Sequence, residues 1–134
     1  MNALKQLVYV SEVEKDMFTS DTVTQILKVA RSNNPEKGIS GMLVCNFDHF
    51  LQVLEGPSDE VRHLFDKIAH DKRHKNAKVI GEKDIDEPQF DKWAMGFANT
   101  NKGIWPYADQ SWATLSKQQA MEVLSFAASQ SKAI

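Results

Sequence analysis

The sequence predicts an α+β fold: a ferredoxin-like βαββαβ sandwich with an additional strand and a C-terminal helical cover. Three observations lead to this prediction. Short apolar runs alternate with two amphipathic helix patterns in the order strand, helix, strand, strand, helix, strand. The two runs of the central hairpin are apolar at both alternating positions, so both faces of the sheet must be covered. A helical pattern near the C-terminus can cover the second face.

The first strand and the first helix are predicted from the N-terminal quarter of the chain. Leu4–Ser11 is rich in Leu, Val and Tyr, which favours a strand. Thr19 or Ser20 can cap a helix that runs to about Ser32. We expect Asn33–Pro35 to end this helix, because a residue before proline avoids the helical conformation. The helix carries one apolar stripe, formed by Val23, Ile26, Leu27 and Ala30.

A hairpin and a second helix follow. Gly38–Cys45 and Phe50–Leu54 are predicted strands, joined by a turn at Asn46–His49. We interpret Glu55, at the end of the hairpin, as a turn or helix-terminus residue. Ser58 begins a helix whose apolar stripe has the same spacing as the first and is formed by Val61, Leu64, Phe65 and Ile68.

The last third of the chain supplies the remaining elements. Ala77–Gly81 is predicted as a fourth strand and Phe90–Phe97 as a fifth. Leu115–Ser129 is predicted as the final helix, capped near Ser116 or Thr114. This helix is the element that can cover the second face of the sheet.

The composition fits one domain of ordinary size, with 134 residues, of which 42% are hydrophobic and 25% are charged. A formal net charge of −2 gives no reason to expect a nucleic-acid or membrane partner. The single cysteine, Cys45, excludes an internal disulfide, and the four histidines lack metal-ligand spacing, so no metal site is predicted. Since no signal-peptide pattern or membrane-spanning apolar run occurs, we expect a cytoplasmic protein.

Three polar residues stand where apolar residues are expected. Gln52 interrupts an apolar strand pattern, Tyr9 lies within another, and Asn34 follows an amphipathic helix pattern. A buried amide costs about 1–3 kcal/mol unless its donors and acceptors are paired. The chain therefore either satisfies Gln52 internally or offers it to a ligand, and the three residues together favour a buried polar ligand.

Six short motifs carry a resemblance to a known family. They occur in the order Leu7–Ser11, Ala30–Asn34, Gly38–Leu43, Phe50–Gly56, Asp71–His74 and Trp93–Met95. In this arrangement the sequence resembles the BLUF family, the flavin-binding blue-light sensor domains, from about Leu4 to Phe97. The resemblance implies the fold predicted above and an FAD, with FMN as the alternative, held non-covalently between the two sheet-packed helices.

The resemblance also assigns polar contacts to the flavin ring. Tyr9 matches the family's photochemical tyrosine, which passes an electron and a proton toward the flavin in the light. Gln52 matches the glutamine that bonds both that tyrosine and the flavin. Asn34 matches the asparagine at the pyrimidine carbonyl edge, and Asn33 matches a neighbour that helps. The chemistry is suitable, because amide side chains both donate and accept hydrogen bonds.

Four further positions match flavin contacts. Ile26 and Ile68 match the apolar residues on either side of the isoalloxazine ring, which is a flat apolar plate. Arg73 and His74 match loop residues near the ribityl-phosphate side, where an anion suits basic partners. Read without the resemblance, Ile26 and Ile68 are ordinary core residues, and Arg73 and His74 belong to a solvated turn.

The output of the domain is expected from its C-terminal part. Trp93 and Met95 match two fifth-strand residues that can exchange places beside the glutamine. We expect a flavin-binding domain at 1–98 and a helical extension at 99–134 that packs on the sheet. This arrangement resembles the short type of the family, which implies no enzymatic activity, signalling through a homo-oligomer and a separate downstream protein partner.

Two other function classes remain open on the sequence alone. One is a flavin redox enzyme, which the absence of a carboxylate pair for acid–base work and of a nicotinamide motif disfavours. The other is a cofactor-free ferredoxin-like interaction domain. An absorption spectrum before and after blue light separates these two classes from a photoreceptor.

Overall fold

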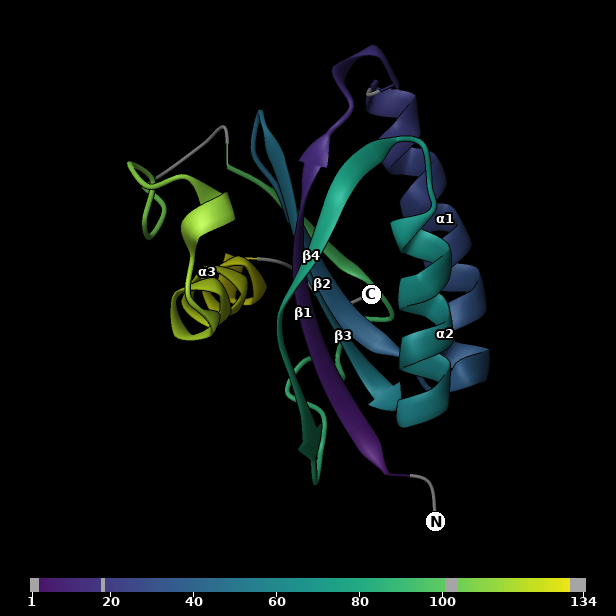
Figure 1. Cartoon of the computed structure of the whole chain (residues 1–134). Helices are drawn as coiled ribbons and strands as arrows, with labels where there is room; N and C mark the ends of the chain where they lie inside the picture. The colour runs from purple at the N-terminus through teal and green to yellow at the C-terminus, as the bar shows by residue number, and fades with distance from the viewer. Residues whose placement is uncertain (1–2, 18, 101–103, 131–134) are drawn as a thin grey trace.

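The computed structural model describes residues 3–17, 19–100 and 104–130. A five-stranded sheet lies between two helical layers (Figure 1), with α1 and α2 on one face and α3 on the other. The elements are β1 Leu4–Val13, a 3₁₀ turn Lys15–Met17, α1 Ser20–Lys37, β2 Ser40–Cys45, β3 His49–Pro57, α2 Ser58–Ala69, β4 His74–Ile85, β5 Gly96–Asn99, a 3₁₀ turn Trp112–Thr114 and α3 Lys117–Gln130. Within these described residues, no helix combines the length and apolar character needed to cross a membrane.

The strand order β4-β1-β3-β2-β5 confirms the predicted ferredoxin-like plan. β3 pairs antiparallel with both β1 and β2, so β1 and β2 run in the same direction with β3 between them. β4 adds antiparallel to β1, and the additional strand β5 adds parallel to β2. The central strands are therefore β1, β3 and β2, and Tyr9 and Gln52 project from β1 and β3.

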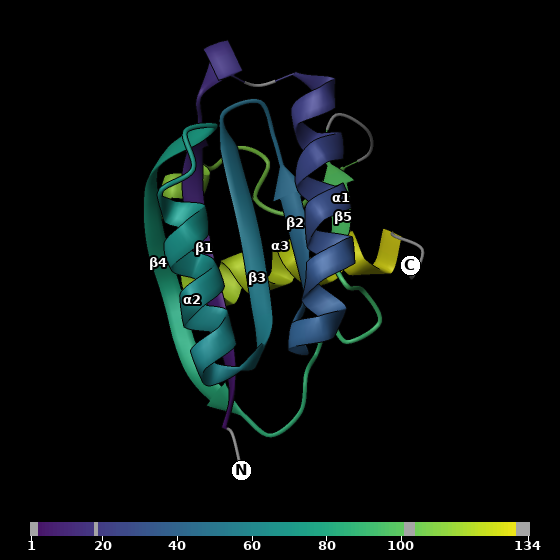
Figure 2. The same ribbon diagram turned by 90° about the vertical axis from the view of Figure 1, so that its right-hand side faces the viewer.

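The two faces of the sheet carry separate apolar cores. Along β3, Leu51 and Val53 face α3, whereas Phe50 and Leu54 face α1 and α2. Figure 2 shows α1 and α2 side by side in front of the sheet, with α3 crossing behind it. The apolar character at both alternating positions of the hairpin is thus explained by cover on both sides.

Helix α1 ends later than the sequence predicts. Thr19 caps it, accepting a hydrogen bond from the backbone N–H of Thr22. The helix continues through Pro35 to Lys37, so the expectation that Asn33–Pro35 ends it is wrong. Gly38, with φ of 71°, donates to the carbonyl of Pro35, and Ile39 donates to that of Asn34. This left-handed glycine cap satisfies the last carbonyls and sets the true end.

The later strands also differ from their predicted bounds. β4 begins at His74 and runs to Ile85, well beyond the predicted Ala77–Gly81, because its residues pair with β1 and need no apolar pattern at the exposed edge. β5 contains only Gly96–Asn99, so the prediction of a strand from Phe90 is wrong. The backbone before it instead forms a turn, in which the N–H of Trp93 bonds the carbonyl of Phe90.

The C-terminal helix covers the second face as predicted. α3 packs against β2, β3 and β5. Ser116 and Gln119 cap its start reciprocally, each side-chain oxygen accepting from the other's backbone N–H. Trp105 and Trp112 are buried in the same core. Residues 101–103 of the extension lie outside the described residues.

Candidate functional site

A cavity of about 300 Å³ lies between α1, α2 and the sheet. Its floor is formed by side chains of β1, β2 and β3, and its two walls by the facing sides of the helices. The residues around it include Tyr9, Leu43, Phe50 and Gln52 from the sheet, Ile26, Val29, Ala30, Asn33, Asn34 and Lys37 from α1, Leu64, Lys67 and Ile68 from α2, and Asp71, Arg73, His74 and Met95. Nine of the ten residues that the sequence assigns to a flavin site therefore line one cavity.

The central feature of the cavity floor is a chain of three side chains. Tyr9 and Gln52 are directly opposite each other in the β1–β3 register. The Tyr9 hydroxyl donates to Oε1 of Gln52 at 2.5 Å, and Nε2 of Gln52 donates to the sulfur of Met95 at 3.2 Å. Gln52 is only 4% exposed. Its buried amide is thus satisfied internally at both ends, while it still lines the cavity.

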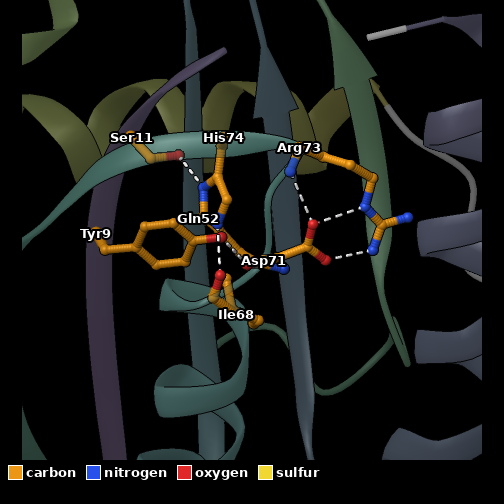
Figure 3. A network of polar contacts seen from close by, with 7 residues as sticks. All are labelled: Tyr9, Ser11, Gln52, Ile68, Asp71, Arg73 and His74. Carbon is orange, nitrogen blue, oxygen red and sulfur yellow. Dashed lines mark hydrogen bonds and ion pairs between the residues drawn. The ribbon is translucent and has the colours of Figure 1, made fainter. Parts of the chain in front are cut away.

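The environment of Tyr9 keeps its phenol protonated. Burial raises the pKa of Tyr9 above its usual value, and the negative charge of Asp71 raises it further. The Tyr9 ring packs against that of Phe65, with ring centroids 5.4 Å apart. The phenolic proton is therefore held on Tyr9 and directed toward the Gln52 oxygen (Figure 3).

His74 is a buried residue at the start of β4, not a loop residue. Its Nε2 bonds the carbonyl of Ile68, so this nitrogen carries a proton, and its Nδ1 bonds the hydroxyl of Ser11 at 2.6 Å. Figure 3 shows the ring held between these two partners beside Gln52. His74 thus joins β1 to the C-terminal end of α2 at the cavity wall.

Arg73 lies at the cavity rim in an ion pair with Asp71. Its Nε donates to Oδ1 of Asp71 at 2.9 Å, and its Nη2 bonds Oδ2. These hydrogen bonds hold the pKa of the Asp71 carboxyl below its usual range. The rim also contains Lys37 and Lys67. The sequence reasoning missed Asp71 and both lysines, although Asp71 stands two residues before Arg73 in the quoted motif.

The amide of Asn34 is hydrogen-bonded to the backbone just before β5. Its Nδ2 donates to the carbonyl of Ala94 at 2.8 Å, and the side chain is 2% exposed. An amide has two N–H groups and an oxygen, so this bond uses one donor and fixes the direction of the rest. Asn33, the neighbouring position, is exposed at the cavity mouth.

Trp93 and Met95 lie on opposite faces of the sheet. Met95 belongs to the core beside the cavity, whereas Trp93 packs in the core under α3. Two residues apart in a regular strand would share a face. They do not here because the turn from Phe90 to Trp93 precedes β5. The structure therefore brings Met95, and not Trp93, to Gln52.

Glu55 is a further buried polar residue, which the sequence reasoning misread. Its side chain is 0% exposed and points to the α3 face of β3, opposite the cavity. It accepts hydrogen bonds from Nε2 of Gln6 and from the backbone N–H groups of Gln89 and Phe90. It is not a turn or helix-terminus residue. Gln6, a polar residue directly before the apolar run Leu7–Val10, was the available signal.

Known proteins resemble this chain in sequence. The chain is 32% identical over 73 residues to the blue light- and temperature-regulated antirepressor BluF of Escherichia coli, covering 54% of this chain and 18% of the relative. It is 29% identical over 93 residues to the photoactivated adenylate cyclase subunit alpha of Euglena gracilis, covering 69% of this chain and 9% of the relative. The chain thus spans less than a fifth of the length of these curated relatives.

Solved structures resemble it over nearly its whole length. The dark-state structure of BlrB, a BLUF protein, has a TM-score of 0.81 and 27% identity, covering 97% of this chain and 98% of that one. The photo-activated state of BlsA has a TM-score of 0.81 and 29% identity, covering 93% and 94%. The model of the family described as sensors of blue-light using FAD matches residues 4–96. The chain therefore belongs to the BLUF family of blue-light sensors.

Proposed function

We propose that this BLUF protein holds FAD, in preference to FMN, in the cavity between α1 and α2, and that Tyr9 and Gln52 convert light absorption into a change of hydrogen bonds. The observation that carries the proposal is the chain Tyr9–Gln52–Met95 on the cavity floor, in which a buried phenol, an amide and a thioether are joined by two hydrogen bonds.

The residues around the cavity fit a flavin. Ile26 on α1 and Ile68 on α2 offer apolar contacts from facing walls, as a flat ring requires. Asn34 and Gln52 present amide groups along one side, which suit the polar edge of an isoalloxazine. A volume of about 300 Å³ lies at the lower end of the range of ligand pockets, roughly 300–1,000 Å³, and is enough for a ring system whose tail extends through the mouth.

The cavity rim suits the phosphate groups of a flavin nucleotide. Lys37, Lys67 and Arg73 place three cationic side chains there. Asp71 neutralises part of the Arg73 charge, which leaves the lysines as the main attraction for an anion. The phosphate monoester of FMN carries about −1.5 to −2 charge near pH 7, similar to the charge of the FAD pyrophosphate, so this rim suits either nucleotide. We prefer FAD because the family model that matches residues 4–96 is described as sensors of blue-light using FAD.

When bound, the flavin supplies the absorption of blue light and an excited state that accepts an electron. Tyr9 is the proposed donor, because its ring lies on the cavity floor. A phenol that has lost an electron is strongly acidic, and its proton is already directed at Oε1 of Gln52 at 2.5 Å. The proton can then move to this oxygen. Gln52 would no longer make its original bonds, and its contact with the Met95 sulfur would change.

We further propose that the signal leaves through protein–protein contacts. The sequence relatives include an antirepressor and a subunit of a photoactivated cyclase, whose names describe outputs joined to a light-regulated region. In this chain the part beyond residue 98, with α3 on the rear face of the sheet, is the proposed output region. It would act on a second copy of the chain or on a separate protein.

The test is to identify the bound molecule. Protein purified in dim light is denatured, and the released compound is separated by chromatography against FAD and FMN standards. We expect free FAD, released without proteolysis, because binding is non-covalent. A colourless protein that takes up neither added FAD nor added FMN would overturn the proposal. Release of FMN, with no uptake of FAD, would contradict the assigned preference.

A further inference from the structure

The segment between β4 and β5 that carries Met95 is held by hydrogen bonds from three elements. This connecting segment, residues 89–95, runs along the sheet edge before β5 begins. At its end, Arg31 donates to the carbonyl of Met95 at 3.1 Å and Asn34 to that of Ala94. In its middle, the N–H of Gly41 on β2 donates to the carbonyl of Trp93 at 3.1 Å.

Glu55 holds the beginning of the connecting segment. Its Oε1 accepts from the backbone N–H groups of Gln89 at 2.8 Å and Phe90 at 2.7 Å. The carbonyl of Phe90 in turn accepts from Trp93. One uninterrupted series of hydrogen bonds therefore leads from the Glu55 side chain through the turn to Gly41.

Glu55 is a carboxyl group buried in an otherwise apolar core. On the same face of β3, Leu51 and Val53 are apolar core residues. A buried carboxyl group destabilises a core unless its oxygens are well paired. Oε2 of Glu55 also takes an N–H of Gln6 at 2.8 Å. Within the described residues, Oε1 of Gln6 is then left without a hydrogen-bond partner.

We propose that Glu55 is a positioning residue for the light response. It fixes the connecting segment at the edge of the sheet, and this places the Met95 sulfur where it accepts a hydrogen bond from the Gln52 amide. Glu55 and Gln52 project from opposite faces of β3, and the segment contacts both. Glu55 touches neither the cavity nor Gln52, so it acts through Met95. The inference rests on the proposed role of Gln52 in the flavin site.

The experiment measures how fast the illuminated, flavin-bound protein returns to its dark spectrum. Glu55→Ala and Glu55→Leu remove both backbone bonds, and Glu55→Leu fills the volume if Glu55→Ala does not fold. In the proposed function the Gln52–Met95 bond is lost in the light and re-formed on the return to the dark, so loosening Met95 should raise the barrier to recovery. We expect recovery to slow by about threefold or more, the scale on which contacting residues couple.

Three controls separate positioning from general stability. Glu55→Gln keeps an acceptor for Gln89 and Phe90 and gives Gln6 a new donor, so recovery should stay within about 1.5-fold of the parent. Gln6→Leu breaks a bond to the same carboxyl but not those to the segment, so it should lower the Tm and leave recovery unchanged. In a Met95→Ala background, Glu55→Leu should slow recovery by less than about 1.5-fold, since Met95 transmits the effect.

Two results overturn the inference without touching the proposed function. One is a parent-like recovery rate in folded, flavin-bound Glu55→Leu. The other is an equal slowing by Glu55→Leu with and without Met95, which would show that Glu55 acts by another route. If the parent itself binds no flavin or gives no light-induced shift, the proposed function fails first, so the two failures are distinguishable.

Discussion

The contact between Tyr9 and Gln52 is set by strand register and not by a loop. The two residues are directly paired across β1 and β3, so their side chains share a face at the close spacing of cross-strand neighbours. A shift of one residue in this pairing would move either side chain to the α3 face. The hydrogen bond of 2.5 Å is therefore as well fixed as the sheet itself.

The raised pKa of Tyr9 has a consequence for stability in alkali. The unfolded chain releases the phenol proton from about pH 10, while the folded protein keeps it to a higher pH. The unfolded state then binds fewer protons, so the free energy of unfolding falls as pH rises above 10. Below pH 10 the phenol is protonated in both states, so Tyr9 does not make the free energy of unfolding depend on pH.

Tyr9→Phe lacks this alkaline loss, and we expect its free energy of unfolding to fall less steeply than that of the parent above about pH 10. Denaturant titrations of both proteins at a series of pH values measure the two slopes. Parallel slopes above pH 10 would contradict a raised pKa at Tyr9.

Asn34→Ala tests the polar edge of the site. Removing one hydrogen bond to a ligand costs about 0.5–1.5 kcal/mol, and the upper value is a factor of about ten in affinity. We expect flavin affinity to fall by about tenfold and the dark spectrum to shift, as measured by titration of flavin-depleted protein. Asn33→Ala, at the exposed mouth, is the matched control and should have the smaller effect. An unchanged flavin affinity together with an unchanged dark spectrum in Asn34→Ala would show that Asn34 does not contact the polar edge of the ring.

At the scale of elements, apolar patterning predicted what is buried and missed what is held by backbone bonds alone. The hairpin and the stripes of α1 and α2 were found because buried residues must be apolar. Most of β4 was missed because it is an edge strand with exposed, charged positions. The predicted fifth strand began too early, at Phe90. Phe90 and Trp93 are buried in a turn, and burial alone does not distinguish a turn from a strand.

The sequence predicted which residues gather at the cavity to a similar extent, and their roles toward a flavin stay a prediction. The resemblance to a family supplied residues whose roles depend on a ligand, and most of them gather at one cavity. It did not supply the role of Glu55, which accepts hydrogen bonds from Gln6 and from two backbone N–H groups more than thirty residues away. The backbone contacts follow from the path of the chain and leave no periodic trace in the sequence, so Gln6 was the available signal.

Gly41 allows β2 and β3 to approach closely. A Cβ atom at this position would lie 2.1 Å from the carbonyl oxygen of Val53, a backbone atom that cannot move aside. Gly41→Ala should lower the free energy of unfolding by about 1–3 kcal/mol, as overpacking does in a core. Gly81→Ala is the control, because the atoms nearest to its Cβ would belong to the flexible Lys117 side chain. Equal unfolding midpoints for the two variants would contradict this packing.

At the scale of the whole molecule, the sheet separates the cavity from α3. The cavity proposed as the flavin site lies on one face and the proposed output helix on the other (Figure 1). The connecting segment 89–95 reaches both, because Met95 lies beside Gln52 and Trp93 packs under α3. A change at Gln52 can therefore cross the sheet at its edge, through a packed element with two arrangements.

Met95→Ala tests this route. It removes the thioether that accepts from Gln52 and leaves Tyr9 and Gln52 in place. We expect the variant to keep the flavin red shift while weakening any light-dependent change in oligomer size or partner binding. Size-exclusion chromatography of parent and variant, in the dark and under illumination, is the measurement. A full light-dependent change in the variant would show that Met95 does not transmit the signal.

The most direct test of the account is an absorption spectrum of the purified protein before and after blue light, compared with Tyr9→Phe and Gln52→Ala. The parent should show an oxidised flavin band that shifts slightly to the red and returns in the dark. Both variants should bind flavin and lose the shift, because one lacks the phenolic donor and the other the amide that receives its proton. A Tyr9→Phe protein that shifts and recovers like the parent would contradict the central role of the Tyr9–Gln52 pair.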